Sequence, residues 1–233
     1  MKYLLALAVL VAAPLAAAPA VKKAPPRAPV RVNWVQTVVA TPEGGIRMGN
    51  PAAPIKLIEY GSRTCPHCAK FDAEGLPALK AGPIATGKLS YEFREYPVHG
   101  SLDFAPILLG RCVPVSKFFP VLDLMFSNQN ALLANVQEVA AKVPANATAL
   151  QAANTFGNGL GYVAFMKKLG LPEAKAKACL NDPAGIDRIV ARTKAANDAY
   201  NISGTPTFIV NGKPAANVYE WATLEPVLRD AGI

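Results

Sequence analysis

The sequence has few residues that could bind a metal: four cysteines and two histidines in 233 residues. A closed structural zinc site needs about four Cys or His ligands, usually supplied by two closely spaced pairs. Only Cys65 and Cys68 are closely spaced, and His67 lies inside the loop between them. The remaining candidates stand apart from one another: His99, Cys112 and Cys179. The sequence therefore argues against a zinc site, and we expect neither a metal nor another cofactor.

Acidic residues are also scarce, since 16 Asp and Glu against 24 Lys and Arg leave a formal net charge of +8. A basic protein can bind nucleic acid, but such proteins carry Lys and Arg clustered in a patch or stripe. Here the basic residues are scattered, as on an ordinary solvated surface, except in the proline-rich stretch of residues 21–33. We therefore expect a basic surface and no nucleic-acid partner.

The apolar stretch near the N-terminus, Tyr3 to Val11, is short for a membrane span, which needs about 20 apolar residues. It follows Lys2 and precedes an alanine-rich segment, which is the order of parts in a secretory signal peptide. We expect cleavage after Ala20, with Ala18 as the alternative site and an uncleaved anchor as the alternative interpretation. No cysteine lies near these positions, which argues against a lipid-attached form.

The most informative stretch is Cys65-Pro66-His67-Cys68. The apolar run Ile55–Tyr60 before it has the length and composition of a strand, and the proline is favoured at the first position of a helix. We therefore expect Cys65 at a helix N-terminus, where free amides and the helix dipole stabilise a thiolate. Cys68 lies one turn further on, within reach of a disulfide, and a protonated His67 would lower the pKa of Cys65 further. A purely structural disulfide is the alternative.

A second signal lies far downstream, where Thr205 and Pro206 precede an apolar run. Proline at a strand start or in a tight turn is where cis peptide bonds occur. A strand, a C-x-x-C helix and a late Thr-Pro before a strand together resemble the thioredoxin superfamily. The Cys-Pro-His-Cys motif, with Glu59 six residues before Cys65, most resembles the DsbA-like thiol:disulfide oxidoreductases. The resemblance runs from roughly Trp34 to the C-terminus.

The resemblance implies an α/β thioredoxin-like fold: a mixed sheet flanked by helices, with an inserted all-helical domain. We expect the thioredoxin-like domain at 34–100 and 201–233 and the helical domain at 101–200. A signal peptide (1–20) and a proline-rich basic linker (21–33) precede them.

Local patterns predict the individual elements. The expected strands are Trp34–Val39, Ile55–Tyr60, Lys88–Glu95, Phe208–Val210 and Lys213–Val218. The expected helices are Pro66 to about Lys80, Val115–Phe126, Leu132–Lys142, Gly159–Leu169, Pro172–Leu180, Pro183–Tyr200 and Trp221–Ala231. Gly75 and Pro77 suggest a kink or an early end of the first of these helices.

Glu59 is unusual because it lies within an expected central strand. Such strands are covered on both faces, so an acid there is costly unless it has a task or a partner. The resemblance implies that its carboxylate helps to move a proton to or from Cys68. The alternatives are an ion pair with Lys56 or Arg94, or exposure at a strand end.

Cys112 and Cys179 are the remaining cysteines. The even number of cysteines and the expected export favour a structural disulfide between them. Such a bridge would contribute roughly 4 kcal/mol on the chain-entropy model. The alternative is two buried free thiols, which pack as small hydrophobic groups.

The resemblance implies a dithiol oxidase in which Cys65 is attacked by a substrate thiolate and Cys68 is the resolving thiol. Thr205, beside Pro206, would pair with an extended substrate as an added strand. The implied partners are unfolded exported proteins with free thiols and a quinone-linked membrane oxidoreductase that restores the disulfide. We expect a monomer in the periplasm.

Two alternatives remain open. A disulfide isomerase or reductase would use the same fold, and Thr205 also occurs in isomerase-like relatives, whereas the best-known oxidases have valine there. The stretch before Trp34 is short for the dimerisation domain of those relatives, which favours the oxidase. The other alternative is a non-catalytic exported binding module or chaperone.

Overall fold

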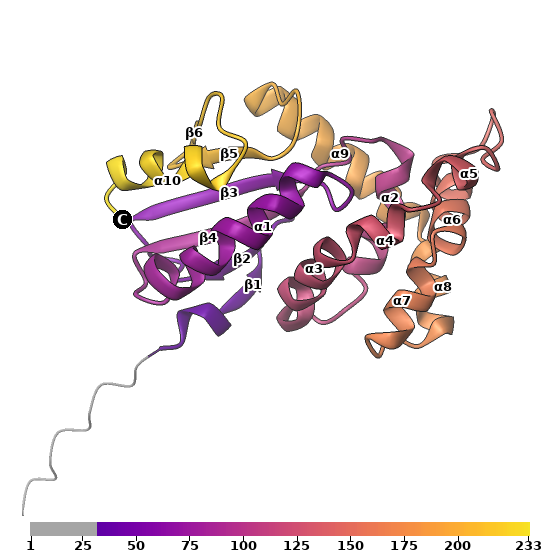
Figure 1. Ribbon diagram of the computed structural model, residues 1–233, viewed down its shortest axis with the longest axis horizontal. Helices are drawn as coiled ribbons and strands as arrows, with labels where there is room; N and C mark the ends of the chain where they lie inside the picture. Colours follow the sequence, from indigo (N-terminus) through magenta and orange to yellow (C-terminus); the bar gives the residue numbers. More distant parts are fainter. Residues whose placement is uncertain (1–31) are drawn as a thin grey trace, which may run out of the picture. The chain divides into compact units, whose positions relative to one another are not determined.

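The computed structural model describes residues 32–233, of which Asn33–Ile233 form one compact unit (Figure 1). The expected signal peptide (1–20) and most of the expected linker (21–33) lie outside the described residues. Within the described part, no helix is both long enough and apolar enough to cross a membrane.

A six-stranded mixed sheet forms the centre, in the order β1-β2-β4-β3-β5-β6. Only β3 and β4 pair in parallel, and the other neighbours are antiparallel. Asn211 and Gly212, both with positive φ, form the turn between β5 and β6, as the sequence predicts. The strands are β1 Val38–Ala40, β2 Ile46–Gly49, β3 Ile55–Gly61, β4 Leu89–Glu95, β5 Thr207–Val210 and β6 Lys213–Pro214.

Helices cover both faces of this sheet, which confirms the expected thioredoxin-like α/β class. All helices between β4 and β5 fall in one segment that begins at Ser101 and ends at Tyr200. The helices are α1 Pro66–Leu79, α2 Ser101–Gly110, α3 Phe118–Ser127, α4 Gln129–Leu133, α5 Val136–Ala140, α6 Ala149–Gly159, α7 Tyr162–Lys168, α8 Glu173–Leu180, α9 Pro183–Tyr200 and α10 Trp221–Asp230. Figure 1 shows α5 to α8 gathered beyond the end of the sheet, to the right in this view.

The two faces of the sheet pack against different helices because side chains alternate along each strand. Leu57 on β3 and Phe93 on β4 belong to a core cluster that also holds buried residues of α1, α3 and α10. Tyr60 on β3 and Ile209 on β5 belong to a second cluster with Ala196 of α9. The α1 face is rich in aromatic rings that are almost completely buried: Phe71, Tyr91, Phe93, Phe118, Phe119 and Phe208.

The predicted first strand, Trp34–Val39, is wrong in its first half. Trp34–Gln36 form a 3₁₀ turn, because the Asn33 side chain accepts a hydrogen bond from the Gln36 amide (3.3 Å). Pairing begins only at Val38, so β1 spans three residues. The sequence pattern also missed β2, a four-residue strand with the partly buried Arg47 at its second position.

One further helix prediction, one missed helix and one strand end need correction. The expected helix Leu132–Lys142 is two short helices, α4 and α5, because the backbone leaves the helical conformation at Asn135 (ψ 24°). Helix α6 was missed, although its start carries a recognisable signal: Thr148 and Gln151 form a reciprocal capping box. At the other end of the chain, β6 stops at Pro214 rather than Val218.

Helix α1 does not end early at Pro77. It continues to Leu79 and passes directly into a π-helical turn, Lys80–Ile84. A proline inside a helix costs one backbone hydrogen bond, which burial of neighbouring side chains can offset. Leu76 and Leu79 supply that burial, since each is at most 1% exposed.

Candidate functional site

The cysteine motif lies where β3 leads into α1. Cys65 is the N-cap of α1 and has extended backbone angles, and Pro66 occupies the first turn, as the sequence predicts. Both cysteines are free thiols, with Cys65 5% and Cys68 0% exposed, whereas Pro66 and His67 are exposed to solvent. One sulfur therefore lies just beneath the surface and the other is fully covered.

The loop that presents Cys65 is held by Asp103 of α2. One carboxylate oxygen accepts hydrogen bonds from the Ser62 hydroxyl (2.8 Å) and the Thr64 hydroxyl (2.6 Å). The other accepts from the backbone amide of His99 (2.8 Å). Asp103 is 0% exposed, and burial raises the pKa of its carboxyl despite these bonds. The helical segment thus fixes the conformation of the active loop.

Two more side chains support the same loop. The Gln129 side chain of α4 donates to the backbone oxygens of Arg63 and Cys65, both at 3.0 Å. Arg63 is 1% exposed, and its guanidinium pairs with Glu95 at 2.8 Å. Sequence reasoning missed Arg63, Asp103 and Gln129, since a polar residue in a turn or on a helix does not reveal its long-range partner.

The Cys65 thiol is unusually acidic, with its pKa lowered to about 5. The largest cause is a hydrogen bond from the Cys68 side chain, and burial acts in the opposite direction. The polar Thr205 side chain and the backbone amides of Cys68 and His67 at the helix start lower the pKa further. As a neutral thiol, Cys65 Sγ instead donates to the backbone oxygen of Thr205 at 3.1 Å.

The Cys68 thiol behaves in the opposite way. Burial raises its pKa well above the ordinary value, and its role as donor to Cys65 and the charge of Glu59 add to this. At neutral pH the pair therefore consists of a Cys65 thiolate beside a Cys68 thiol. That asymmetry is what a nucleophile and its resolving partner need.

Glu59 is buried on the α1 face of β3, 1% exposed, and has none of the ion pairs considered as alternatives. The Lys56 ammonium donates to backbone oxygens of residues 51 and 53, and Arg94 pairs with Glu92 at 2.7 Å. The Tyr91 hydroxyl donates to Glu59 Oε2, and Oε1 has no hydrogen-bond partner among the described residues. Burial raises the pKa of Glu59 to about 8, although the Tyr91 bond opposes this shift.

Gly61, two residues after Glu59 on the same strand face, makes room for this carboxyl. A Cβ at Gly61 would lie 2.8 Å from Glu59 Oε1 and would overlap the Phe93 ring. The space for the Glu59 carboxyl therefore depends on the absence of a side chain at Gly61, at the end of β3.

Thr205 lies against Cys65, and a cis peptide bond joins it to Pro206. Thr205 is 8% exposed, and its buried hydroxyl oxygen has no hydrogen-bond partner among the described residues. The structure thus brings together the motif at 65–68, Glu59, Thr205 and Pro206. No group of three or more potential metal ligands occurs in the described part of the chain.

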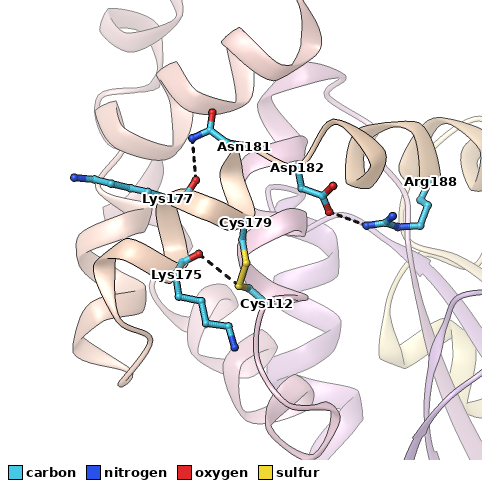
Figure 2. Close-up of a disulfide and its surroundings, with 7 residues drawn as sticks. All are labelled: Cys112, Lys175, Lys177, Cys179, Asn181, Asp182 and Arg188. Atoms are coloured by element: carbon cyan, nitrogen blue, oxygen red, sulfur yellow. Dashed lines mark hydrogen bonds and ion pairs between the residues drawn. A yellow bond between two sulfur atoms is a disulfide. The ribbon is translucent and has the colours of Figure 1, made fainter.

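Cys112 and Cys179 are joined in a disulfide, with their Cα atoms 6.2 Å apart. Figure 2 shows that it ties the segment after α2 to helix α8, with Cys112 Sγ 3.9 Å from the Lys175 backbone oxygen. The bridge is remote in sequence from the motif and holds the helical segment together.

Comparison with known proteins agrees with this arrangement. A family model described as Thioredoxin matches residues 41–230, so the chain belongs to the thioredoxin family. A protein of Rickettsia felis named "Putative protein-disulfide oxidoreductase" is 26% identical over 84% of this chain, and the match spans only 62% of that protein.

Two solved structures share this fold. The crystal structure of a protein-disulfide isomerase from Novosphingobium aromaticivorans is 30% identical, with a TM-score of 0.74, and the match covers 80% of this chain and 97% of that one. Wolbachia pipientis alpha-DsbA1 shares the fold at 22% identity, with a TM-score of 0.61 over 83% of this chain and 93% of that one.

Proposed function

We propose that this protein is a thiol:disulfide oxidoreductase that introduces disulfides into other proteins through Cys65 and Cys68. The observation that carries the proposal is the opposed pKa shifts of two neighbouring thiols, with that of Cys65 lowered to about 5 and that of Cys68 raised. A stable Cys65 thiolate is a good leaving group and stabilises the reduced form, which makes the disulfide form more oxidising.

The exchange begins from the Cys65–Cys68 disulfide. A substrate thiolate attacks Cys65 Sγ, the bond between the two cysteines breaks, and Cys68 leaves as a thiolate. Glu59, whose pKa is raised to about 8, is protonated at neutral pH and supplies the proton that Cys68 takes up. A second substrate thiolate then attacks the substrate sulfur of the mixed disulfide, and Cys65 leaves. The substrate loses two electrons to the cysteine pair.

Thr205 and Pro206 form the proposed substrate-binding loop. The Thr205 backbone lies next to Cys65, so an extended peptide that pairs with it would place a cysteine beside the reactive sulfur. Main-chain pairing is independent of side chains, which suits unfolded exported proteins of many sequences as substrates.

The Cys112–Cys179 disulfide supports an oxidising compartment, and we assign the protein to the periplasm. Turnover needs an electron acceptor, for which a quinone-linked membrane oxidoreductase is the proposed partner. The protein is proposed to act as a monomer.

Disulfide isomerisation on the same site is the second candidate. It is favoured by Thr205 before the proline and by the name of the Novosphingobium structure. An isomerase would attack a wrong disulfide with its Cys65 thiolate and return the electrons when the correct bond forms.

A redox titration against glutathione, combined with refolding assays, separates the candidates. An oxidase has a high reduction potential and accelerates refolding of a reduced substrate protein. An isomerase, when its own cysteines are reduced, accelerates refolding of a substrate protein with scrambled disulfides. Cys65→Ser should abolish both activities, and an unchanged activity in this variant would leave only a non-catalytic binding module or chaperone.

A further inference from the structure

A cavity of about 440 Å³ lies on the α9 face of the sheet, away from the cysteine motif. Its apolar lining comes from β3, α2 and α9 and includes Tyr60, Ile107, Leu108, Ile189, Ala196 and Tyr200. The Cys112–Cys179 bridge and the Asp182–Arg188 pair also line it, and Figure 2 shows these two pairs near each other. Its volume falls in the range of small-molecule sites, about 300–1,000 Å³.

Four arginines line this cavity, and two of them have acids of their own. Arg188 donates to Asp182 at 2.7 Å, and Arg94 donates to Glu92 at 2.7 Å. These two guanidiniums are neutralised locally, so they add little attraction for a ligand. The other two are Arg111, after α2, and Arg192 of α9.

Arg111 shares its ion-pair partner with another arginine. The nearest carboxylate is Glu95, at 3.6 Å from Arg111 Nε, and Arg63 already bonds to Glu95 at 2.8 and 3.1 Å. Arg111 Nε is buried and has no hydrogen-bond partner among the described residues. One carboxylate therefore serves two cations, and a buried donor at the cavity is left unused.

Arg192 forms no ion pair within the described part of the chain. Its guanidinium lies over Gly44, and a Cβ at that position would overlap it. Burial lowers the pKa of both Arg111 and Arg192, and neighbouring arginines lower it further, whereas the charge of Glu95 acts on both in the opposite direction. Arginine stays charged under such conditions. Four arginines and three acids, Glu43, Glu95 and Asp182, line the cavity, so positive charge is in excess there.

We propose that this cavity binds a small amphipathic anion, a carboxylate on an apolar body, with the carboxylate between Arg111 and Arg192. The planar fork of a guanidinium matches a carboxylate and can bond it at two points. The walls formed by Ile107, Leu108 and Ile189 would cover the apolar body. The site is separate from the proposed disulfide exchange, because none of its lining residues belongs to the cysteine motif.

Calorimetry with decanoate, below its micelle concentration, tests the proposal. Two ligands of the same chain length are the controls: decanol, which is uncharged, and decylammonium, which is positively charged. We expect decanoate to bind one site and both analogues to bind at least about tenfold more weakly, because hydrogen bonds to charged groups are among the stronger ones. Equal binding of decanoate and decanol, or no binding of decanoate, would overturn the proposal.

Variants locate the site. Arg192→Gln changes an exposed residue and should weaken decanoate binding about tenfold, as should Arg111→Gln. Lys194→Gln on the same helix, whose ammonium pairs with Asp198, is the control and should bind as the parent does. Ala195→Trp, at an exposed position of the lining, should block the cavity. Unchanged affinity in Arg192→Gln and Ala195→Trp would place the ligand elsewhere and refute the assignment, and disulfide exchange serves as the check on folding.

Discussion

The Tyr91 hydroxyl donates a hydrogen bond of 2.5 Å to the Glu59 carboxylate, across the parallel pair of β3 and β4. Leu57 is the direct partner of Tyr91 in the register, so Glu59 is its diagonal neighbour on the same face of the sheet. This bond replaces an ion pair. It opposes the effect of burial only in part, and burial raises the pKa of Glu59 to about 8, so the proton stays on the carboxyl at neutral pH.

The stability of Glu59→Gln relative to that of the parent protein should therefore increase as pH rises. The folded-state pKa of Glu59, about 8, lies above the ordinary value of 4.5, so the cost of burying this acid is absent below pH 4.5 and grows up to about pH 8. The free energy of unfolding of the variant minus that of the parent should be about 3 kcal/mol larger at pH 7 than at pH 4. Urea denaturation at the two pH values measures this, with Glu74→Gln on the surface of α1 as the control.

The same variant should be a poorer catalyst, because a glutamine amide cannot supply the proton that Cys68 takes up. We expect the step in which Cys68 leaves to slow by about 100-fold, within the range of general acid–base effects. Stopped-flow reaction of the oxidised protein with a thiol peptide measures this step. A rate equal to that of the parent would remove Glu59 from the mechanism.

Thr205→Val should raise the pKa of Cys65. The polar side chain of Thr205 is one of the influences that lower this pKa to about 5, and valine keeps the shape but removes the hydroxyl. Alkylation of the reduced protein by iodoacetamide as a function of pH should give a midpoint near 5 for the parent and a higher one for the variant. The exposed Thr86→Val is the matched control. A parent midpoint near 8.5, as in an ordinary thiol, would contradict the proposed site.

The low pKa of Cys65 also predicts how the redox state affects stability. The pKa of Cys65 in the folded state is below that in the unfolded chain, so the thiolate stabilises the reduced protein above about pH 8.5, and this contribution is lost as pH falls through about 5. The melting temperature of the reduced form minus that of the oxidised form should therefore increase as pH rises from about 5 to about 8.5. In Cys65→Ala this pH dependence should disappear, and its persistence would assign it to another group.

The sequence singles out residues that lie together around the cysteine motif, but it does not single out the residues that support them. The motif at 65–68, Glu59 and the Thr205-Pro206 step are local patterns: a strand, a helix start with proline, an acid in an apolar run. Tyr91 looks like an ordinary strand residue, and Asp103 like a polar residue in the first turn of a helix. Their roles arise from tertiary contacts, which side-chain periodicity does not encode.

The same reasoning explains the errors in the fold. The capping box at Thr148 and Gln151 is visible in the sequence, but the helix that follows contains Asn154, Gly157 and Asn158, which weaken the helical pattern. The 3₁₀ turn at Trp34–Gln36 depends on one side-chain hydrogen bond from Asn33, and apolar composition alone favours a strand there.

Asp103→Asn should disturb the position of Cys65 without touching its sulfur. Asp103 accepts from Ser62, Thr64 and the His99 amide, and an asparagine must turn its own N–H₂ toward one of these donors. We expect a loss of about 1–3 kcal/mol of stability and slower exchange with a thiol peptide. The control is Asp187→Asn at an exposed position of α9, which should leave both unchanged.

The Cys112–Cys179 bridge should contribute to stability and not to exchange. The two cysteines are 67 residues apart in the sequence, and closing a loop of that length contributes about 4 kcal/mol on the chain-entropy model. Replacing both cysteines by serine should therefore lower the free energy of unfolding by about this amount, as measured by urea denaturation. The alkylation midpoint of Cys65 should stay near 5 in this variant, because the residues that lower it come from α1 and the Thr205 loop. A shifted midpoint would show that the helical segment controls the acidity of the active thiol, and a change in the reduction potential of the Cys65–Cys68 pair would accompany it.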